Sequence, residues 1–569
     1  MHAKRLTASV CTVLLIISLV LSACGSSESS QKSGEQKLDK DQTLNLFFES
    51  PTTLDVNDVR NSSEFQLLTQ VQEGLVRTYT DKNGKEKIEP AGAKSWKITD
   101  NGKVYTFKLR DYKWSDGKKV TAQNYVDSVI RLLDPKKAFA YAFFAYDIKN
   151  AEKYNAGKAK AGDVGVKALD DNTLQITLEK PTPQFNKKFG FVALFPIRLD
   201  VIKKGGETYA TDYKAQVFSG PFIIKSWVKD NSLVLKKNPK YWDAKNVHLK
   251  TVNFKTVEET STQASLFQSK QTDVIAGTQQ YIKKWAAEAK QGKIQYIHGN
   301  TPLTSYIVFN QKTGGTSGLL KNAKIRQALS LAINRQDLVK LVFGRYRPAY
   351  GLIPNGIQVG DKDYRDDVAQ PLKPLYDKYN GNKSELQRLF KEGLKELGVN
   401  KKLGDVTLTL ITTGTDALSK SEQEYYQQEW EKNLGIKVKL NILESKLFVA
   451  DRNANKYDLL LNGWFGDYND PSTFVDMWTT NNGFSKFFGY YSSKKYDQLY
   501  QSLDGVTDDA QREKIYAALE KQLIAEDAGV APIYYGDSQY FVQNYVKNIS
   551  FPLFGTPIDF SRTYISGKQ

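Results

Sequence analysis

The residues best placed to do chemistry lie in one stretch, residues 458–471. It begins as an apolar run typical of a buried strand and ends in a turn-forming segment. Such a strand would deliver an aromatic ring, Trp464, and a carboxylate, Asp467, to its own C-terminal end. We therefore expect a site there, although an aspartate in this setting can also be a simple turn residue. Asp470, which precedes a proline, fits a structural turn better.

Signatures of catalysis and metal binding are scarce elsewhere in the chain. Among 569 residues there are 3 histidines and 2 cysteines. His248 and His298 have no partner at a metal-ligand spacing, so we expect no metal and no other cofactor. No Gly-x-Ser-x-Gly elbow and no phosphate-binding loop ending in Gly-Lys-Ser/Thr occurs. Most catalytic roles are therefore disfavoured, and a secreted hydrolase stays an alternative that lacks a recognisable catalytic set.

Charge and length restrict the class of protein further. The formal net charge is +17, from 80 Lys and Arg against 63 Asp and Glu. The lysines are dispersed without long runs, which favours a solvated surface over a nucleic-acid site. A surface adhesin or a chaperone is a further alternative function, and the basic charge is the only feature that supports it. A chain of this length should form two or more domains.

The first forty residues resemble an export and anchoring segment. Residues 1–23 combine a basic start, a short apolar run and small residues, which is typical of a secretory signal. The Leu-Ser-Ala-Cys sequence ending at Cys24 resembles a bacterial lipobox. That resemblance implies cleavage before Cys24 and a lipid on its sulfur, which would anchor the protein to the membrane. Residues 24–40 are polar and predict a flexible tether.

Local patterns predict a mixture of strands and helices. Alternating apolar residues predict a strand at 104–110, and Thr121 is a candidate N-cap for the helix that follows. A helix at 423–434 should end at Gly435 and lead into another strand, which is an α/β unit. A final helix is predicted at 509–526.

Four blocks, in this order, resemble the extracytoplasmic solute-binding proteins of peptide ABC importers, specifically their oligopeptide-binding branch. Together they extend over most of the chain from about residue 44. The blocks are Ala-Lys-Ser-Trp at 93–96 with Tyr-Thr-Phe-Lys-Leu-Arg at 105–110 and Trp-Ser-Asp-Gly at 114–117; Gly-Pro-Phe at 220–222 with Lys-Asn-Pro-Lys-Tyr-Trp at 237–242; Ile-Arg-Gln-Ala-Leu-Ser at 325–330; and Gly-Trp at 463–464 with Asp-Tyr-Asn-Asp-Pro at 467–471.

The resemblance implies an α/β, two-lobed, periplasmic-binding-protein-like fold with three domains and a ligand cleft between the lobes. Closure about a hinge would bury the ligand. The expected division is a signal peptide at 1–23, a tether at 24–40, a discontinuous first lobe at 41–85, 214–299 and 538–569, an additional domain on that lobe at 86–213, and a second lobe at 300–537.

The same resemblance assigns roles to residues of this cleft. Asp467 would receive the α-ammonium of a peptide, since a desolvated ammonium needs a carboxylate. The peptide backbone would pair with residues 462–465, with the facing segment at 60–62 on the other lobe. Trp464 and Tyr141 would face the ligand, or else pack in the core. The ligand-binding candidates are Arg60, Asn61, Ser62, Tyr141, Asn462, Gly463, Trp464, Phe465, Asp467, Tyr468 and Asn469.

The resemblance thus implies a lipid-anchored, monomeric receptor that delivers oligopeptides to an ABC permease at the outer face of a cell membrane, of Gram-positive type. One position departs from some relatives, which carry a basic residue where this chain has Leu461. Fixed recognition of a peptide carboxylate at that position is therefore not expected. A receptor dedicated to one signalling or cell-wall peptide is the alternative.

Overall fold

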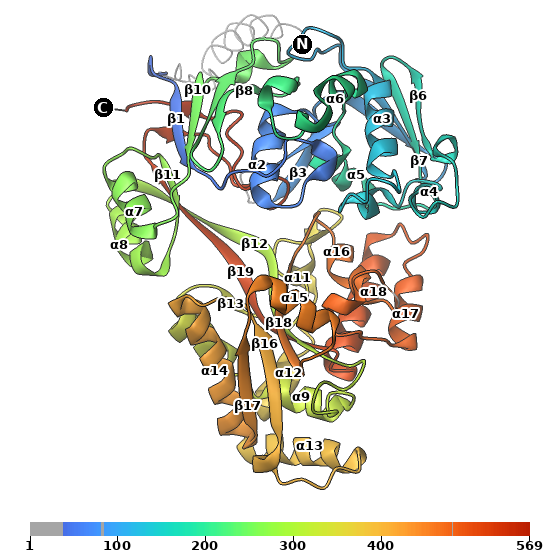
Figure 1. Cartoon of the computed structure of the whole chain (residues 1–569), viewed down its shortest axis with the longest axis vertical. Helices are drawn as coiled ribbons and strands as arrows, with labels where there is room; N and C mark the ends of the chain where they lie inside the picture. Colours follow the sequence, from blue (N-terminus) through green and yellow to red (C-terminus); the bar gives the residue numbers. More distant parts are fainter. Residues whose placement is uncertain (1–37, 81–84, 481, 569) are drawn as a thin grey trace, which may run out of the picture.

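A computed structural model describes residues 38–80, 85–480 and 482–568 in two bodies joined by a pair of long strands (Figure 1). The upper body contains the described residues of 38–293 and 544–568, and the lower body those of 310–529. The predicted signal peptide, Cys24 and most of the predicted tether lie outside the described residues. Across the described ranges, no helix is both long and apolar enough to cross a bilayer.

The upper body contains two four-stranded sheets and three smaller elements of β-structure. The first sheet has the order β1-β10-β9-β8 and the second the order β4-β5-β7-β6. The strands of the first are β1 (Thr43–Phe47), β10 (Thr251–Lys255), β9 (Ser232–Lys237) and β8 (Phe222–Val228); those of the second are β4 (Ala93–Thr99), β5 (Val104–Leu109), β7 (Thr173–Thr177) and β6 (Val166–Asp170); the smaller elements are β2 (Val76–Thr80) with β3 (Glu86–Pro90), β20 (Val546–Lys547) with β21 (Tyr564–Ile565), and β11 (Val274–Ala276).

Helices of the upper body cover these sheets. The amphipathic helix predicted after Thr121 is confirmed, and apolar side chains of this helix and of both sheets belong to one buried cluster. The helices are α2 (Ser62–Val71), α3 (Ala122–Leu132), α4 (Ala151–Asn155), α5 (Phe185–Lys188), α6 (Leu199–Gly205), α7 (Thr260–Gln268) and α8 (Gln279–Lys290).

A seven-stranded sheet connects the two bodies and carries the stretch that includes Asp467. Its order is β11-β19-β12-β18-β16-β17, with β13 beside β19. The two long strands, β12 and β19, run together from the upper into the lower body (Figure 1). The strands not yet given are β12 (Ile294–Phe309), β13 (Arg347–Pro348), β16 (Thr407–Thr412), β17 (Lys437–Ile442), β18 (Leu459–Phe465) and β19 (Val530–Gln543); a separate pair is β14 (Gln358–Val359) with β15 (Lys362–Asp363).

Helices surround the sheet in the lower body and enclose a second large apolar cluster. The helix predicted at 423–434 is confirmed, but it begins at Ala417, because the Asp416 carboxylate caps the N–H groups of Leu418 and Ser419. It ends at Gly435, whose φ of +72° is left-handed. The helices are α9 (Ala323–Leu331), α10 (Arg335–Asp337), α11 (Tyr364–Asp367), α12 (Lys373–Tyr379), α13 (Lys383–Glu396), α14 (Ala417–Leu434), α15 (Ser445–Asn453), α16 (Ser472–Val475), α17 (Lys494–Gln501) and α18 (Asp509–Glu520), which continues as a π-helical turn.

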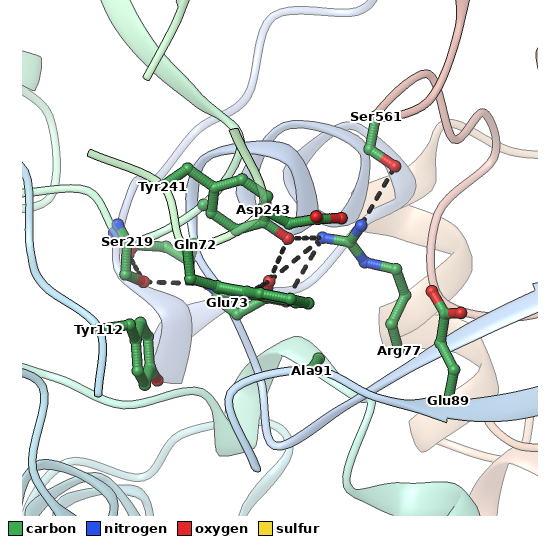
Figure 2. Close-up of polar contacts among 12 residues, drawn as sticks. Gln72, Glu73, Arg77, Glu89, Ala91, Tyr112, Ser219, Tyr241, Asp243 and Ser561 are labelled. Carbon is green, nitrogen blue, oxygen red and sulfur yellow. Dashed lines mark hydrogen bonds and ion pairs between the residues drawn. The ribbon is translucent and has the colours of Figure 1, made fainter. Parts of the chain in front are cut away.

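A buried carboxylate, Glu73, ties three distant parts of the upper body together (Figure 2). Its Oε2 accepts hydrogen bonds from the Tyr241 hydroxyl at 2.5 Å and the Trp242 indole N–H at 2.9 Å. Arg77 lies 3.4 Å away and also donates to Ser561, in the C-terminal segment, at 3.2 Å. The Tyr-Trp pair of the 237–242 block therefore has a structural role.

Replacing Glu73 by alanine should destabilise the protein strongly. Arg77 would remain largely buried without its counter-charge, and breaking a buried pair in this way costs about 3–5 kcal/mol. Urea denaturation, monitored by circular dichroism, measures the loss in the free energy of unfolding. Glu207→Ala, at an exposed site, is the control and should change the free energy of unfolding by less than about 0.5 kcal/mol. Equal stability of the two variants would contradict a structural role for Glu73.

Candidate functional site

Strand β18 has one edge that is only partly paired. On one side it pairs with β12 along its whole length, from Leu459 to Phe465. On the other side, among the described residues, β16 pairs with it only at Leu459 and Leu460. The second half of β18 therefore has a free edge.

The register shows which main-chain groups lie on this edge. The N–H of Gly466 donates to the carbonyl of Pro302 at 2.7 Å, just beyond the pair that Phe465 forms with Leu303. Hydrogen-bonding direction alternates along an antiparallel pair, so Gly463 and Phe465 direct their main-chain groups away from β12. Within the described ranges, the N–H of Gly463 donates only to the neighbouring Asn462 side chain, at 2.9 Å. An extended chain could therefore add to this edge.

Asp467 lies two residues after the end of β18 and is held by the start of the next helix. Its backbone N–H donates to the Thr473 hydroxyl at 3.1 Å. Its carboxylate is approached by the Tyr141 hydroxyl at 3.5 Å and has no ion-pair partner within the described segments. Burial, followed by repulsion from Asp476, raises the pKa of Asp467 to about 7, although the Lys188 ammonium acts in the opposite direction. The site thus holds a buried carboxylate that has no ion-pair contact in the described residues.

Asp467 faces a cavity of about 720 Å³ between the two bodies. The bodies meet beside it, where the Phe143 ring lies 5.5 Å from that of Phe484. The Lys187 ammonium, in the upper body, donates to the Asn469 carbonyl in the lower body at 2.6 Å. This volume is in the range of pockets that take small ligands. Its lining includes Phe139, Phe143, Tyr146, Asp147, Glu152, Gln184, Lys188, Trp464, Asp467, Tyr468, Ser472, Thr473, Asp476, Asn482, Phe484 and Tyr500.

The lining also contains charged residues that the sequence analysis missed. Asp147 and Lys188 pair at 2.5 Å. Asp476 lies one helical turn beyond Thr473, and burial raises its pKa to about 7 even though Lys188 acts in the opposite direction. Its only signal in the sequence is the spacing of three residues from Thr473, which places both side chains on one helical face.

Four of the predicted site residues come together in this region. Trp464, Asp467 and Tyr468 line the cavity, and Tyr141 reaches Asp467. Trp464 and Tyr141 also pack against other rings, with Phe484 5.9 Å from Trp464. The two roles predicted as alternatives for these aromatic residues are therefore compatible.

The other predicted site residues lie outside the cavity lining. Asn462, Gly463 and Phe465 are on β18, whose free edge has been described. The Asn469 side chain is buried and accepts the N–H of Gln358 at 2.8 Å.

The segment at 60–62 forms the start of α2. Asn61 forms a capping box with Glu64, and Ser62 is the first residue of the helix. The Arg60 side chain is exposed and pairs with Asp58 at 2.9 Å. No described contact joins these three residues to the cavity.

The remaining polar groups do not form a metal site. In the described ranges, no group of three or more His, Cys, Asp or Glu side chains is arranged to hold a metal ion. His298 contacts a single carboxylate, that of Asp537, at 3.0 Å. With a buried carboxylate, Asp467, beside a cavity between the two bodies, the site is suited to binding a cationic group of an organic ligand.

Comparisons with known proteins identify what the chain resembles. Residues 87–486 match the bacterial extracellular solute-binding proteins, family 5 (middle region). The dipeptide-binding protein DppE of Bacillus subtilis (strain 168) is 30% identical, over 94% of each chain. The substrate-binding domain of an oligopeptide ABC transporter from Bacillus anthracis str. Ames has a TM-score of 0.77 and 31% identity, with 94% of this chain and 100% of that one covered. Listeria monocytogenes OppA bound to peptide has a TM-score of 0.76 and 33% identity, with 93% of this chain and 100% of that one covered.

Replacing Asp467 by asparagine should stabilise the ligand-free protein above about pH 7. The unfolded chain loses this proton near pH 4 and the folded chain near pH 7, so ionisation lowers the stability of the wild type progressively across that interval. Asp467→Asn removes this cost, and urea denaturation at pH 8 should show a gain of about 1–3 kcal/mol that disappears towards pH 4.

Asp458→Asn is the matched control in the same stretch. The Asp458 carboxylate is fully buried and accepts the N–H groups of Ser317 and Thr409, both at 2.8 Å. An amide cannot satisfy both donors, so this variant should lose about 2 kcal/mol or more. A comparable loss in Asp467→Asn at pH 8 would mean that Asp467 stabilises the fold and would remove the argument for a binding role.

Proposed function

Because the chain belongs to the bacterial extracellular solute-binding proteins of family 5, we propose that it binds oligopeptides and delivers them to an ABC importer. The family predicted from the four blocks and the α/β fold predicted with it are both confirmed by the comparisons. The family is one of binding proteins, in agreement with the expectation that this chain is not an enzyme.

The observation that supports this proposal most directly is the unpaired Asp467 carboxylate between the two bodies. A peptide α-ammonium loses its water when the cavity closes around it, and it needs a carboxylate in exchange. Asp467 has no ion-pair contact within the described residues, and Lys188, the cation that acts on it, is itself paired with Asp147, so a ligand ammonium can supply the missing contact. The contact should be about 2.7–2.9 Å long, the range of charge-assisted hydrogen bonds.

The free edge of β18 supports recognition of the peptide backbone. The main-chain groups of Phe465 and the carbonyl of Gly463 are available to an extended ligand, and the Gly463 N–H becomes available if it gives up its bond to the Asn462 side chain. Such pairing does not depend on the side chains of the ligand. With its ammonium at Asp467, beyond the C-terminal end of the strand, the ligand would run antiparallel to β18. Leu461 carries no charge for the far end of the ligand, which would leave the length of the peptide less constrained.

The lobes and domains predicted from the sequence form part of the same proposal. The first lobe would contain residues 41–85, 214–299 and 538–569, with the domain at 86–213 placed on it. Residues 300–537 would form the second lobe. Strands β12 and β19, which connect the two bodies, would carry the hinge, and closure would complete the cavity around the ligand. The protein would act as a monomer.

Attachment to the membrane through Cys24 completes the proposed function. The lipobox-like sequence and the polar tether would place the receptor at the outer face of the cell membrane, close to its permease. Gram-positive relatives such as DppE of Bacillus subtilis support this placement. The names of the relatives include both dipeptide and oligopeptide binders, so the range of peptide lengths is part of what must be measured.

N-acetylation of a peptide should weaken its binding to the soluble protein that starts after Cys24. Acetylation removes the ammonium, and Asp467→Asn removes its partner, so each change should cost about 2–5 kcal/mol in isothermal calorimetry. A C-terminally amidated peptide is the control and should bind nearly as well as the free peptide, because Leu461 offers no charge to the carboxylate. Equal binding of acetylated and free peptides would refute the role of Asp467.

Replacing Cys24 by serine should release the protein from the cell. Serine cannot carry the thioether-linked lipid, so the variant should move from the membrane pellet to the medium while its affinity for peptides stays unchanged. Mass spectrometry of the N-terminal peptide of the wild type should find a lipid on Cys24. A Cys24→Ser protein that remains in the membrane fraction would show that another segment anchors it.

A further inference from the structure

The cavity contains more negative charge than the ammonium of a ligand would neutralise. Four carboxylates line it, and the single cation among its lining residues is Lys188. Lys188 is already paired with one of the four, Asp147, at 2.5 Å. If a peptide ammonium pairs with Asp467, two carboxylates, Glu152 and Asp476, still have no ion-pair contact among the described residues, although the charge of Lys188 also acts on Asp476.

Asp476 is the better placed of these two. Its carboxylate is hydrogen-bonded by the Met477 backbone N–H, and it has no ion-pair partner in the described part of the chain. Glu152, by contrast, is an exposed residue of the short helix α4. An ionised carboxylate enclosed in a cavity is costly until a cation reaches it. Asp476 therefore indicates a second cationic group in the ligand.

The position of Asp476 relative to Asp467 suits the side chain of a single residue. The Asp467 N–H is bonded to Thr473, and Asp476 is one helical turn from Thr473, a step of about 5.4 Å. Both carboxylates line the same cavity, and repulsion from Asp476 is the largest cause, after burial, that raises the pKa of Asp467. A lysine or arginine whose α-ammonium contacts Asp467 can extend its alkyl chain over such a distance.

The remaining walls also fit a long basic side chain better than they fit a metal ion. Aromatic rings of Phe143, Trp464 and Phe484 line the cavity and can pack along an alkyl stem, while a cation gains from their faces. A metal ion would need several protein ligands, and no group of three or more acidic, His or Cys side chains is arranged to hold one in the described residues.

We propose that this cavity receives the side chain of the first residue of the peptide, and that Asp476 makes the receptor select lysine or arginine at that position. The inference rests on the proposed function, because it requires a peptide whose ammonium contacts Asp467. Asp476 would thus determine specificity for a side chain. The backbone contacts along β18 cannot do so, because they are the same whatever the side chain of the ligand.

The test compares two peptides that differ only at the first residue, lysine or its uncharged analogue norleucine, by isothermal calorimetry on the soluble protein. The wild type should bind the lysine peptide about 30-fold more tightly, the lower end for truncating one partner of a buried charge pair. Asp476→Asn should reduce that ratio to about one, mainly by weakening the lysine peptide. Thermal denaturation establishes that the variant is folded.

A matched control is Asp127→Asn, which removes a carboxylate of α3 outside the cavity lining and should leave the ratio unchanged. If both peptides bind the wild type equally, or if Asp476→Asn keeps the full preference, the inference is wrong. Acetylated forms of both peptides distinguish a failure of this inference from a failure of the proposed function. If the selectivity result contradicts the inference but acetylation still abolishes binding, the proposed function stands. If no peptide binds at all, both fail.

Discussion

The structure depends on one electrostatic requirement: a cation that is taken out of water must meet a carboxylate that is already in place. Such a carboxylate cannot also serve the fold, because a partner within the protein would compete with the ligand. Asp467 meets this requirement. Its backbone is fixed by Thr473, its carboxylate has no ion-pair contact in the described residues, and burial raises its pKa to about 7. The ligand-free protein is thus less stable than it could be, and a bound ammonium would recover that stability.

Other buried charges of the chain show the opposite arrangement. Asp470, three residues from Asp467, accepts the N–H of Ser472 and lies 2.5 Å from Arg512. Although burial acts to raise its pKa, the pKa of Asp470 is lowered, chiefly by Arg512. Glu73 is likewise held by three donors in the upper body (Figure 2). Carboxylates with partners in the protein stabilise the fold, whereas Asp467 and Asp476 have no ion-pair contact in the described residues, as the proposed binding of a cationic ligand requires.

The sequence was sufficient for much of this account, because local patterns and ordered blocks carry the necessary information. Alternation predicted β5, a glycine marked the end of α14, and the order of the blocks identified the family. It could not show that β16 stops pairing with β18 at Leu460, since the pairing of distant strands leaves no local pattern. It also missed Asp476, because that residue joins the cavity only when two bodies from distant parts of the chain meet.

The central claim, that Asp467 receives the ammonium of a peptide, is tested most directly by a crystal structure of the soluble protein with a bound peptide. The account predicts the peptide nitrogen about 2.7–2.9 Å from an Asp467 carboxylate oxygen, with the ligand extended along the free edge of β18. A peptide bound in the cleft with its ammonium in solvent, or against another carboxylate, would contradict the claim.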